Sequence, residues 1–305
     1  MEKNRKSNLY GSLLLCLAAI IWGSSFVAQT TGAEYVGPFT FIAMRSLLGS
    51  VTLLPVIFAM DLFKKSKHRE SYKKMTKADY KALFTGGTAC GVVLFAASSL
   101  QQFGIDKGTP PGNAAFITAL YILLVPIFSV FLGKKIRPVI WVCVGVSIAA
   151  LYLLCVKENS TVQFSDIYVL ACAVCFAVHI IIIDKVSPNL DGVRLSSFQF
   201  FCAGLIALVF MLLTEEVTLD ALVKAFPSIA YSGIMSSAVA YTLQILGQQK
   251  TEPTIATMIM SLESVFGVLT AMVVLSQVPS LREAAGCVLM FGAIIVAQLP
   301  EKSGK

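Results

Sequence analysis

Long apolar stretches separated by short polar segments dominate this sequence. A helix needs roughly 20 apolar residues to cross the hydrocarbon core of a bilayer, and ten stretches approach that length. They are 10–31, 38–60, 82–104, 113–133, 138–156, 166–184, 195–213, 227–247, 254–276 and 281–299. The connections are short, with only 61–81 and 214–226 of any length, and none has room for a soluble domain. The pattern therefore predicts an all-α integral membrane protein with ten transmembrane helices.

One polar motif, Leu-Gln-x-x-Gly-x-x-Lys, occurs near the ends of the third and eighth spans. Its copies lie 143 residues apart: Leu100, Gln101, Gly104 and Lys107, then Leu243, Gln244, Gly247 and Lys250. The copies are five spans apart and every span reverses direction, so the second half must be inverted relative to the first. We therefore expect two five-helix inverted-topology repeats, 1–157 and 158–305. Many secondary transporters base alternating access on such an arrangement.

Composition and charge support a membrane location. The chain is 56% hydrophobic and 13% charged, with a mean hydropathy of +0.78, whereas soluble domains have about 25% charged residues. The net charge is +7, and the basic residues collect on one side of the predicted topology. The positive-inside rule then places both termini in the cytoplasm. We interpret the basic segment 61–81 as a topology signal that attracts anionic lipid, and expect no nucleic-acid partner.

Several local motifs resemble a known family. The stretches AAIIWGSSFV at 18–27 and ALYILLVP at 119–126, Arg45 in the second span and the two five-span halves look like the drug/metabolite transporter superfamily, EamA type. The resemblance covers nearly the whole chain. It implies a ten-helix carrier in the cell membrane, often an exporter of amino acids or other small metabolites. Many members have Gly-Glu after spans four and nine; here Gly133-Lys134 and Ser276-Gln277 stand there.

Two ionisable residues in the spans are the main site candidates, because such groups are costly in hydrocarbon unless they are paired or hydrated. Glu263 is expected near the midplane, where it can carry a proton, meet a substrate amine or form a structural hydrogen bond. Its equivalent in span four is Tyr121. Arg45 in span two can bind a substrate carboxylate, pair with Glu263 or extend toward the outer surface.

Other polar and aromatic residues complete the candidate site. His179 either titrates or forms a neutral hydrogen bond between helices. Gln101 and Gln244 occupy matched positions near opposite mouths, and such amides, like that of Gln199, can also join helices. Aromatic stacking on a substrate is the functional reading of Trp22 and Tyr241, and packing is the structural one. The helix-bending positions expected from the repeat are Pro126 and Gly267.

The sequence favours a carrier over other membrane proteins. It contains no catalytic motif of a membrane-embedded enzyme, no channel filter and no ATP-binding loop. We expect no catalytic residue, no cofactor and no metal site. The predicted partners are a small-molecule substrate, membrane lipid and, through Glu263, protons. A non-transport scaffold or signalling protein and, less favoured, an enzyme are the alternatives, and the oligomeric state is open, a homodimer included.

Overall fold

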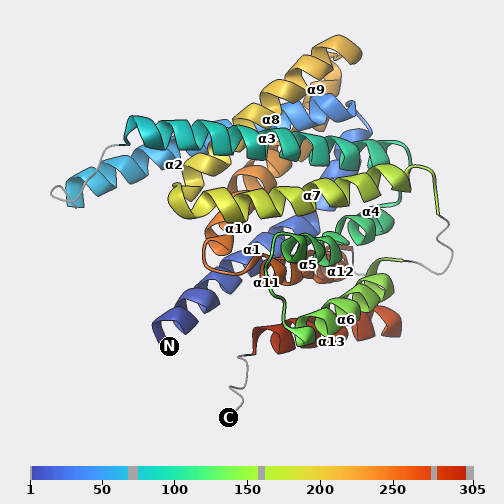
Figure 1. Cartoon of the computed structure of the whole chain (residues 1–305). Coiled ribbons are helices and arrows are strands. Elements are labelled where there is room, and N and C mark those ends of the chain that lie inside the picture. Colours follow the sequence, from blue (N-terminus) through green and yellow to red (C-terminus); the bar gives the residue numbers. More distant parts are fainter. Residues whose placement is uncertain (1, 68–74, 157–161, 276–279, 300–305) are drawn as a thin grey trace.

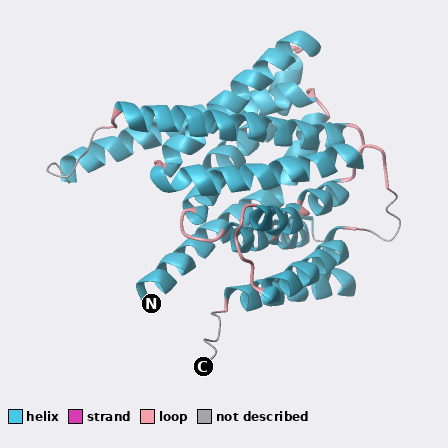
Figure 2. Cartoon of the chain, viewed as in Figure 1, coloured by secondary structure: helices cyan, strands magenta, loops and turns pink. Residues whose placement is uncertain are grey.

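A computed structural model describes residues 2–67, 75–156, 162–275 and 280–299 (Figure 1). Every regular element in these ranges is a helix (Figure 2). The first half contains α1 (Glu2–Ala33), α2 (Pro38–Lys67), α3 (Lys77–Asp106), α4 (Pro111–Thr118), α5 (Tyr121–Phe131) and α6 (Pro138–Cys155). The second contains α7 (Asp166–Val186), η1 (Ser187–Asn189), α8 (Gly192–Thr214), α9 (Leu219–Tyr231), η2 (Ser232–Ala240), α10 (Tyr241–Gln248), α11 (Pro253–Met260), α12 (Leu262–Leu275) and α13 (Leu281–Gln298).

These elements form ten helices long and apolar enough to cross a membrane, as the hydrophobic pattern predicted. The two longest expected connections are shorter than predicted. The third span begins at Lys77, where Thr76 and Asp79 form a reciprocal capping box. The eighth begins at Leu219, because the Thr218 side chain accepts the N–H of Ala221. Polar capping residues thus extend both helices beyond their apolar cores.

Spans four and nine are broken, at positions that the sequence analysis did not identify. The breaks lie at Ala119–Leu120 and at Ser261, 142 residues apart. Each follows a segment of eight residues that begins at a proline. In the second break the Ser261 hydroxyl donates to the Thr257 carbonyl at 2.8 Å, a local bond that bends helices.

The breaks do not coincide with the expected bending positions, Pro126 and Gly267, which stay predictions. Pro126 lies inside α5, which continues past it; membrane helices tolerate proline where neighbouring groups satisfy the freed carbonyl. Gly267 lies inside α12 and faces α1, where a Cβ would meet the Gly23 carbonyl oxygen at 3.4 Å. A Cβ at Gly267 would therefore make an ordinary van der Waals contact with α1.

The two repeats exchange their first helices. From the first half, α1 packs mainly against α9, η2, α10, α11 and α12 of the second. Correspondingly, α7 packs mainly against α3, α4 and α5 of the first half, and Figure 1 shows it beside α3. The pairs α2–α8 and α6–α13 join equivalent helices of the two halves. This pattern is unchanged when the halves are exchanged, as a pseudo-two-fold axis requires. The boundary expected at 157/158 lies outside the described residues and stays a prediction.

One helix departs from this symmetry. In span eight, η2 is a π-helix over Ser232–Ala240, whereas the equivalent span, α3, is α-helical throughout. A Cβ on Gly233 of η2 would lie 3.0 Å from the Arg45 carbonyl oxygen. Rare π-helical segments often occur at functional sites, and this one packs against α2 beside Arg45.

Close contact between α1 and α12 depends on Gly23. A Cβ there would lie 2.6 Å from the Glu263 carbonyl oxygen and 2.8 Å from the Gly267 nitrogen. We predict that Gly23→Ala lowers the free energy of unfolding by about 1–3 kcal/mol, the usual cost of overpacking. Gly292→Ala is the matched control, since a Cβ at Gly292 meets nothing within 4 Å. Thermal unfolding in detergent measures both, and equal stability of the two variants would contradict this packing argument.

Candidate functional site

A cavity lies between the two repeats, near the centre of the spans. It encloses about 540 Å³ of space outside the protein atoms, its mouth included. Its lining comes from α1, α2, α3, both broken spans, α7 and span eight. The lining residues are Trp22, Ser25, Phe26, Gln29, Arg45, Gln101, Thr118, Tyr121, Phe176, Ile180, Ser236, Tyr241, Gln244, Met260 and Glu263. Seven of the residues proposed from the sequence for binding or coupling are therefore collected in one cavity.

The two broken spans meet at this cavity. Tyr121 begins α5 just after the first break, and Glu263 lies in the first turn of α12 just after the second. The Tyr121 hydroxyl donates to Glu263 Oε1 at 3.3 Å, and both side chains are buried. Their numbers differ by 142, the same shift that relates the breaks. The predicted equivalence of these residues therefore corresponds to a direct contact across the pseudo-two-fold axis.

Arg45 is the exceptional charged group of the cavity. It is 3% exposed, and its Nε has no hydrogen-bond partner. Among the described residues it forms no ion pair, so the predicted alternative of an Arg45–Glu263 pair is not seen. The ring centre of Phe41 lies 6.0 Å from the guanidinium carbon. A buried cation without a counter-charge requires an anion or water.

The symmetry equivalents of this arrangement form a hydrogen bond with each other. A shift of 154 residues relates Arg45 to Gln199 and Ser25 to His179. In the second half, His179 Nε2 and Gln199 Oε1 form a hydrogen bond of 3.0 Å, and neither residue lines the cavity. In the first half, both Arg45 and the Ser25 hydroxyl lack this bond and face the cavity. The structure thus favours the hydrogen-bonding role of His179 and Gln199 over the substrate-binding one.

The remaining proposed residues form the cavity wall. Trp22 and Tyr241 pack edge to face, with ring centres 4.9 Å apart. Gln101 donates to the Thr118 hydroxyl at 3.0 Å and Gln244 donates to Gln248 Oε1 at 3.0 Å. Sequence reasoning placed the two glutamines near opposite mouths, whereas both line the same cavity. Each amide thus forms one structural bond, and Gln244 Oε1 is buried without a hydrogen-bond partner.

Sequence reasoning missed lining residues that the repeat itself identifies. Phe176 and Ile180 lie 154 positions after Trp22 and Phe26, and Met260 lies 142 after Thr118. All of them line the cavity. Applying the repeat shift to the candidate Trp22 would have found Phe176, whereas Ile180 and Met260 are equivalents of residues that were not candidates either. Ser236 had no such signal, because it depends on the π-helix that only one half contains.

The cavity lining has more hydrogen-bond donors than carboxylates. Arg45, the hydroxyls of Ser25 and Ser236 and the phenol of Tyr241 offer hydrogen-bond donors, whereas Glu263 is the lining carboxyl. Trp22, Phe26 and Phe176 provide apolar surface between them. Among the described residues, no group of His, Cys, Asp and Glu is arranged to hold a metal ion. The site can receive a small molecule with an anionic group, an apolar body and a cationic or donor group.

Comparisons with known proteins agree with this architecture. The EamA-like transporter family matches residues 9–156 and again 163–298. A protein of Archaeoglobus fulgidus, named an uncharacterized transporter, is 28% identical over 298 residues, which cover 95% of this chain and 86% of the relative. A solved crystal structure, 18% identical, superposes with a TM-score of 0.76 over 94% of this chain and 96% of that one. It shows that the fold has been observed experimentally.

The pair His179–Gln199 is hydrogen-bonded, whereas the equivalent pair Ser25–Arg45 is not. Substitutions in the two pairs should therefore have different effects on stability. Gln199→Leu should lower the free energy of unfolding by about 1–2 kcal/mol, because it leaves the buried His179 nitrogen without its partner. Ser25→Ala should change it by less than about 0.5 kcal/mol, because the Ser25 hydroxyl has no partner to lose. Thermal unfolding in detergent tests both. A larger loss for Ser25→Ala than for Gln199→Leu would show that the pairs are assigned wrongly.

Proposed function

The chain belongs to the EamA-like transporter family, and from this premise we propose that it is a secondary carrier exporting small metabolites. Its substrates would be amino acids or related polar or amphipathic compounds, moved by alternating access between the inverted repeats. The cavity is lined by Arg45, Glu263 and aromatic side chains, a combination of a few polar groups and apolar surface that is typical of small-molecule sites. Its position at the interface of the repeats is where such carriers bind substrate.

The unpaired Arg45 is the observation that carries this proposal. A buried guanidinium is expensive unless a counter-charge or hydrogen-bond acceptor reaches it, and the described protein groups supply no carboxylate there. A substrate carboxylate meets that requirement and can bind in a bidentate geometry. Ser25, Ser236 and Tyr241 would add donors to the same anion.

Glu263 would serve the opposite end of the substrate. Its carboxyl accepts one hydrogen bond, from Tyr121, which leaves lone pairs for a substrate ammonium or a coupling proton. Glu263 lies beside the break of span nine, so its protonation or ligation can be transmitted to both broken helices. Trp22 and Tyr241 would contact the body of the substrate between Arg45 and Glu263.

The membrane orientation belongs to the same proposal. We place the protein in the cell membrane with both termini cytoplasmic, supported by the basic residues of 61–81 and the positive-inside rule. Membrane lipid surrounds the exposed apolar faces. A homodimer is one assembly compatible with this arrangement.

Metabolite analysis of the medium tests export. Cells that make the wild type should release a few carboxylate-containing compounds that cells with an empty vector retain, since Arg45 selects an anion. Mass spectrometry of the medium measures the difference. If the two media match while the protein is folded in the membrane, export is wrong, and uptake or a role other than transport is favoured.

Charge-removing variants test the two assigned residues. Arg45→Gln should reduce transport of the identified compound at least about tenfold, as expected for the loss of a buried charged contact. Glu263→Gln should reduce the rate or abolish its pH dependence. Arg282→Gln and Glu252→Gln are matched controls outside the cavity lining and should transport normally. Unchanged rate and pH dependence in Glu263→Gln would remove that residue from the mechanism.

A further inference from the structure

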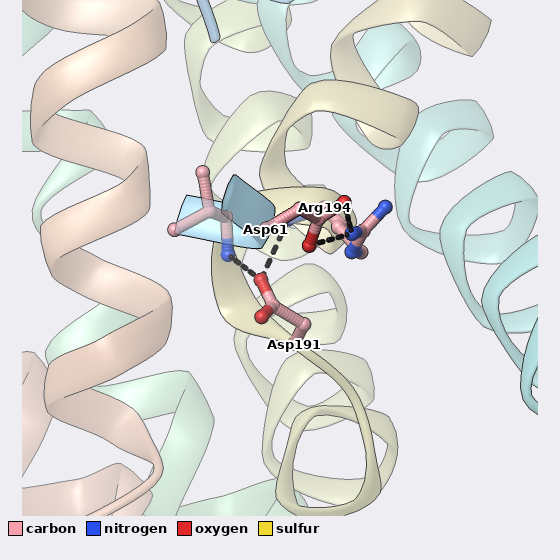
Figure 3. Close-up of polar contacts among 4 residues, drawn as sticks. Asp61, Asp191 and Arg194 are labelled. Atoms are coloured by element: carbon pink, nitrogen blue, oxygen red, sulfur yellow. Dashed lines mark hydrogen bonds and ion pairs between the residues drawn. The ribbon is translucent and has the colours of Figure 1, made fainter. Parts of the chain in front are cut away.

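The α2–α8 pair carries a charged contact at one end. We call the side of the bundle where α1 begins, α2 ends and α8 begins the N-terminal face; it lies to the left in Figure 1. There, Arg194 Nη2 lies 2.6 Å from both carboxylate oxygens of Asp61 (Figure 3). Asp191 Oδ1 accepts the backbone N–H groups of Val193 and Arg194 at 3.1 and 3.2 Å. The Asp61 carboxylate is thus attached to a capped helix start.

A second carboxylate makes a corresponding contact at the opposite face, where α8 ends and α2 begins. Glu215 accepts the backbone N–H groups of Phe39 and Thr40, each at 2.8 Å, and the Thr40 hydroxyl at 2.6 Å. A Cβ on Gly37 would lie 2.6 Å from both Glu215 oxygens. The glycine therefore leaves room for the carboxylate at the helix start, where N–H groups favour negative charge.

The two contacts occupy equivalent positions in the two repeats. Asp61 and Glu215 differ by 154 residues, and so do Thr40 and Arg194. The starts of α2 and α8, Pro38 and Gly192, have the same shift. Because the repeats are inverted, one copy lies on each face of the bundle. In each, a carboxylate near the end of one helix holds the first turn of the other.

Additional bonds join helices at the N-terminal face. Gln248 donates to the Ile180 carbonyl at 3.2 Å, and Gln249 donates to the carbonyls of Ser187 and Leu190 at 2.7 and 3.1 Å. These bonds join α10 to α7 and η1. The equivalents of the two glutamines on the opposite face, by the shift of 143, are Ile105 and Asp106. An isoleucine side chain cannot form such a bond.

The cavity lining is also asymmetric. It includes Gln29, in the part of α1 toward the opposite face, but not the equivalent Ile183, which is fully buried. At the opposite face, Gln102 donates to the Gln29 carbonyl at 3.3 Å, and the Thr109 hydroxyl donates to Ser165 and Asp166 at 2.8 and 3.0 Å. Each face is therefore closed by its own set of bonds.

We propose that Asp61–Arg194 and Glu215–Thr40 are symmetry-related latches, positioning residues that set which face of the carrier is closed. The inference rests on the proposed alternating access. To open one face, α2 and α8 separate at that end and break its latch while the other latch holds. The latches differ chemically: an ion pair closes the N-terminal face, and a helix-capping carboxylate closes the opposite one. Removing the charge of Asp61 should therefore favour opening of the N-terminal face, and removing that of Glu215 should favour opening of the opposite face.

Labelling of single reporter cysteines with a membrane-impermeant maleimide tests this in the full chain. Ile180→Cys reports on the N-terminal side of the cavity and Gln29→Cys on the opposite side. Asp61→Asn should raise labelling of Ile180→Cys from the N-terminal face about 1.5-fold to 5-fold, as expected for loss of a partly exposed ion pair. Glu215→Gln should instead raise labelling of Gln29→Cys from the opposite face. Parent chains without a reporter give the background from the native cysteines.

Further variants separate a latch from a purely structural contact. Asp61→Arg combined with Arg194→Asp should restore the labelling pattern of the parent. If Glu215→Gln does not fold, Thr40→Val replaces it in the test. This variant removes one of the three bonds to Glu215 and should shift labelling in the same direction, more weakly. Equal labelling changes at both reporters, or none, would overturn the inference. Opposite shifts in a protein that exports nothing would keep the latches and remove only the proposed substrate function.

Discussion

Hydrocarbon offers no partner to a polar group, and the whole structure reflects this constraint. Buried polar side chains bond across the repeats, as Tyr121 does to Glu263 and Ser50 to Ser197, and within a repeat, as His179 does to Gln199. Arg45 differs from these residues, because it is a buried cation whose Nε has no hydrogen-bond partner. Burial without a partner is tolerated only where something else supplies the partner for part of the time. The missing counter-charge of Arg45 therefore supports the proposal that a ligand binds in the cavity.

Inverted repetition explains how one short sequence pattern gives both a scaffold and a site. Residues near the axis meet their own equivalents, which makes Tyr121 and Glu263 neighbours. Equivalent residues have diverged, and their contacts differ. Gln199 forms a hydrogen bond with His179, whereas the equivalent Arg45 forms none with Ser25 and lines the cavity. The π-helix η2 adds a second asymmetry on the same side. In the proposed mechanism, the symmetry of the repeats would allow alternating access, and the differences between equivalent residues would select the substrate.

Much of this was accessible from the sequence. The ten spans, the inverted halves and the collection of Arg45, Tyr121 and Glu263 around one cavity followed from hydropathy and the repeat. The breaks at Ala119 and Ser261 did not, because helices break where local hydrogen bonds compete with the backbone, and proline alone is a poor guide. The Asp61–Arg194 contact was also missed, because it joins residues from different halves whose pairing depends on the crossing of α2 and α8.

The exchange of α1 and α7 has a consequence for biogenesis. During synthesis, α1 enters the membrane first, but its principal neighbours, α9 to α12, belong to the last part of the chain. At usual rates of about 5–20 residues per second, it waits roughly ten seconds or more for them. Its polar inner surface, which includes Ser25 and Gln29, must meanwhile be shielded by lipid headgroups, by other helices or by the insertion machinery. Neither repeat can therefore mature as an independent half; assembly of the bundle is a property of the completed chain.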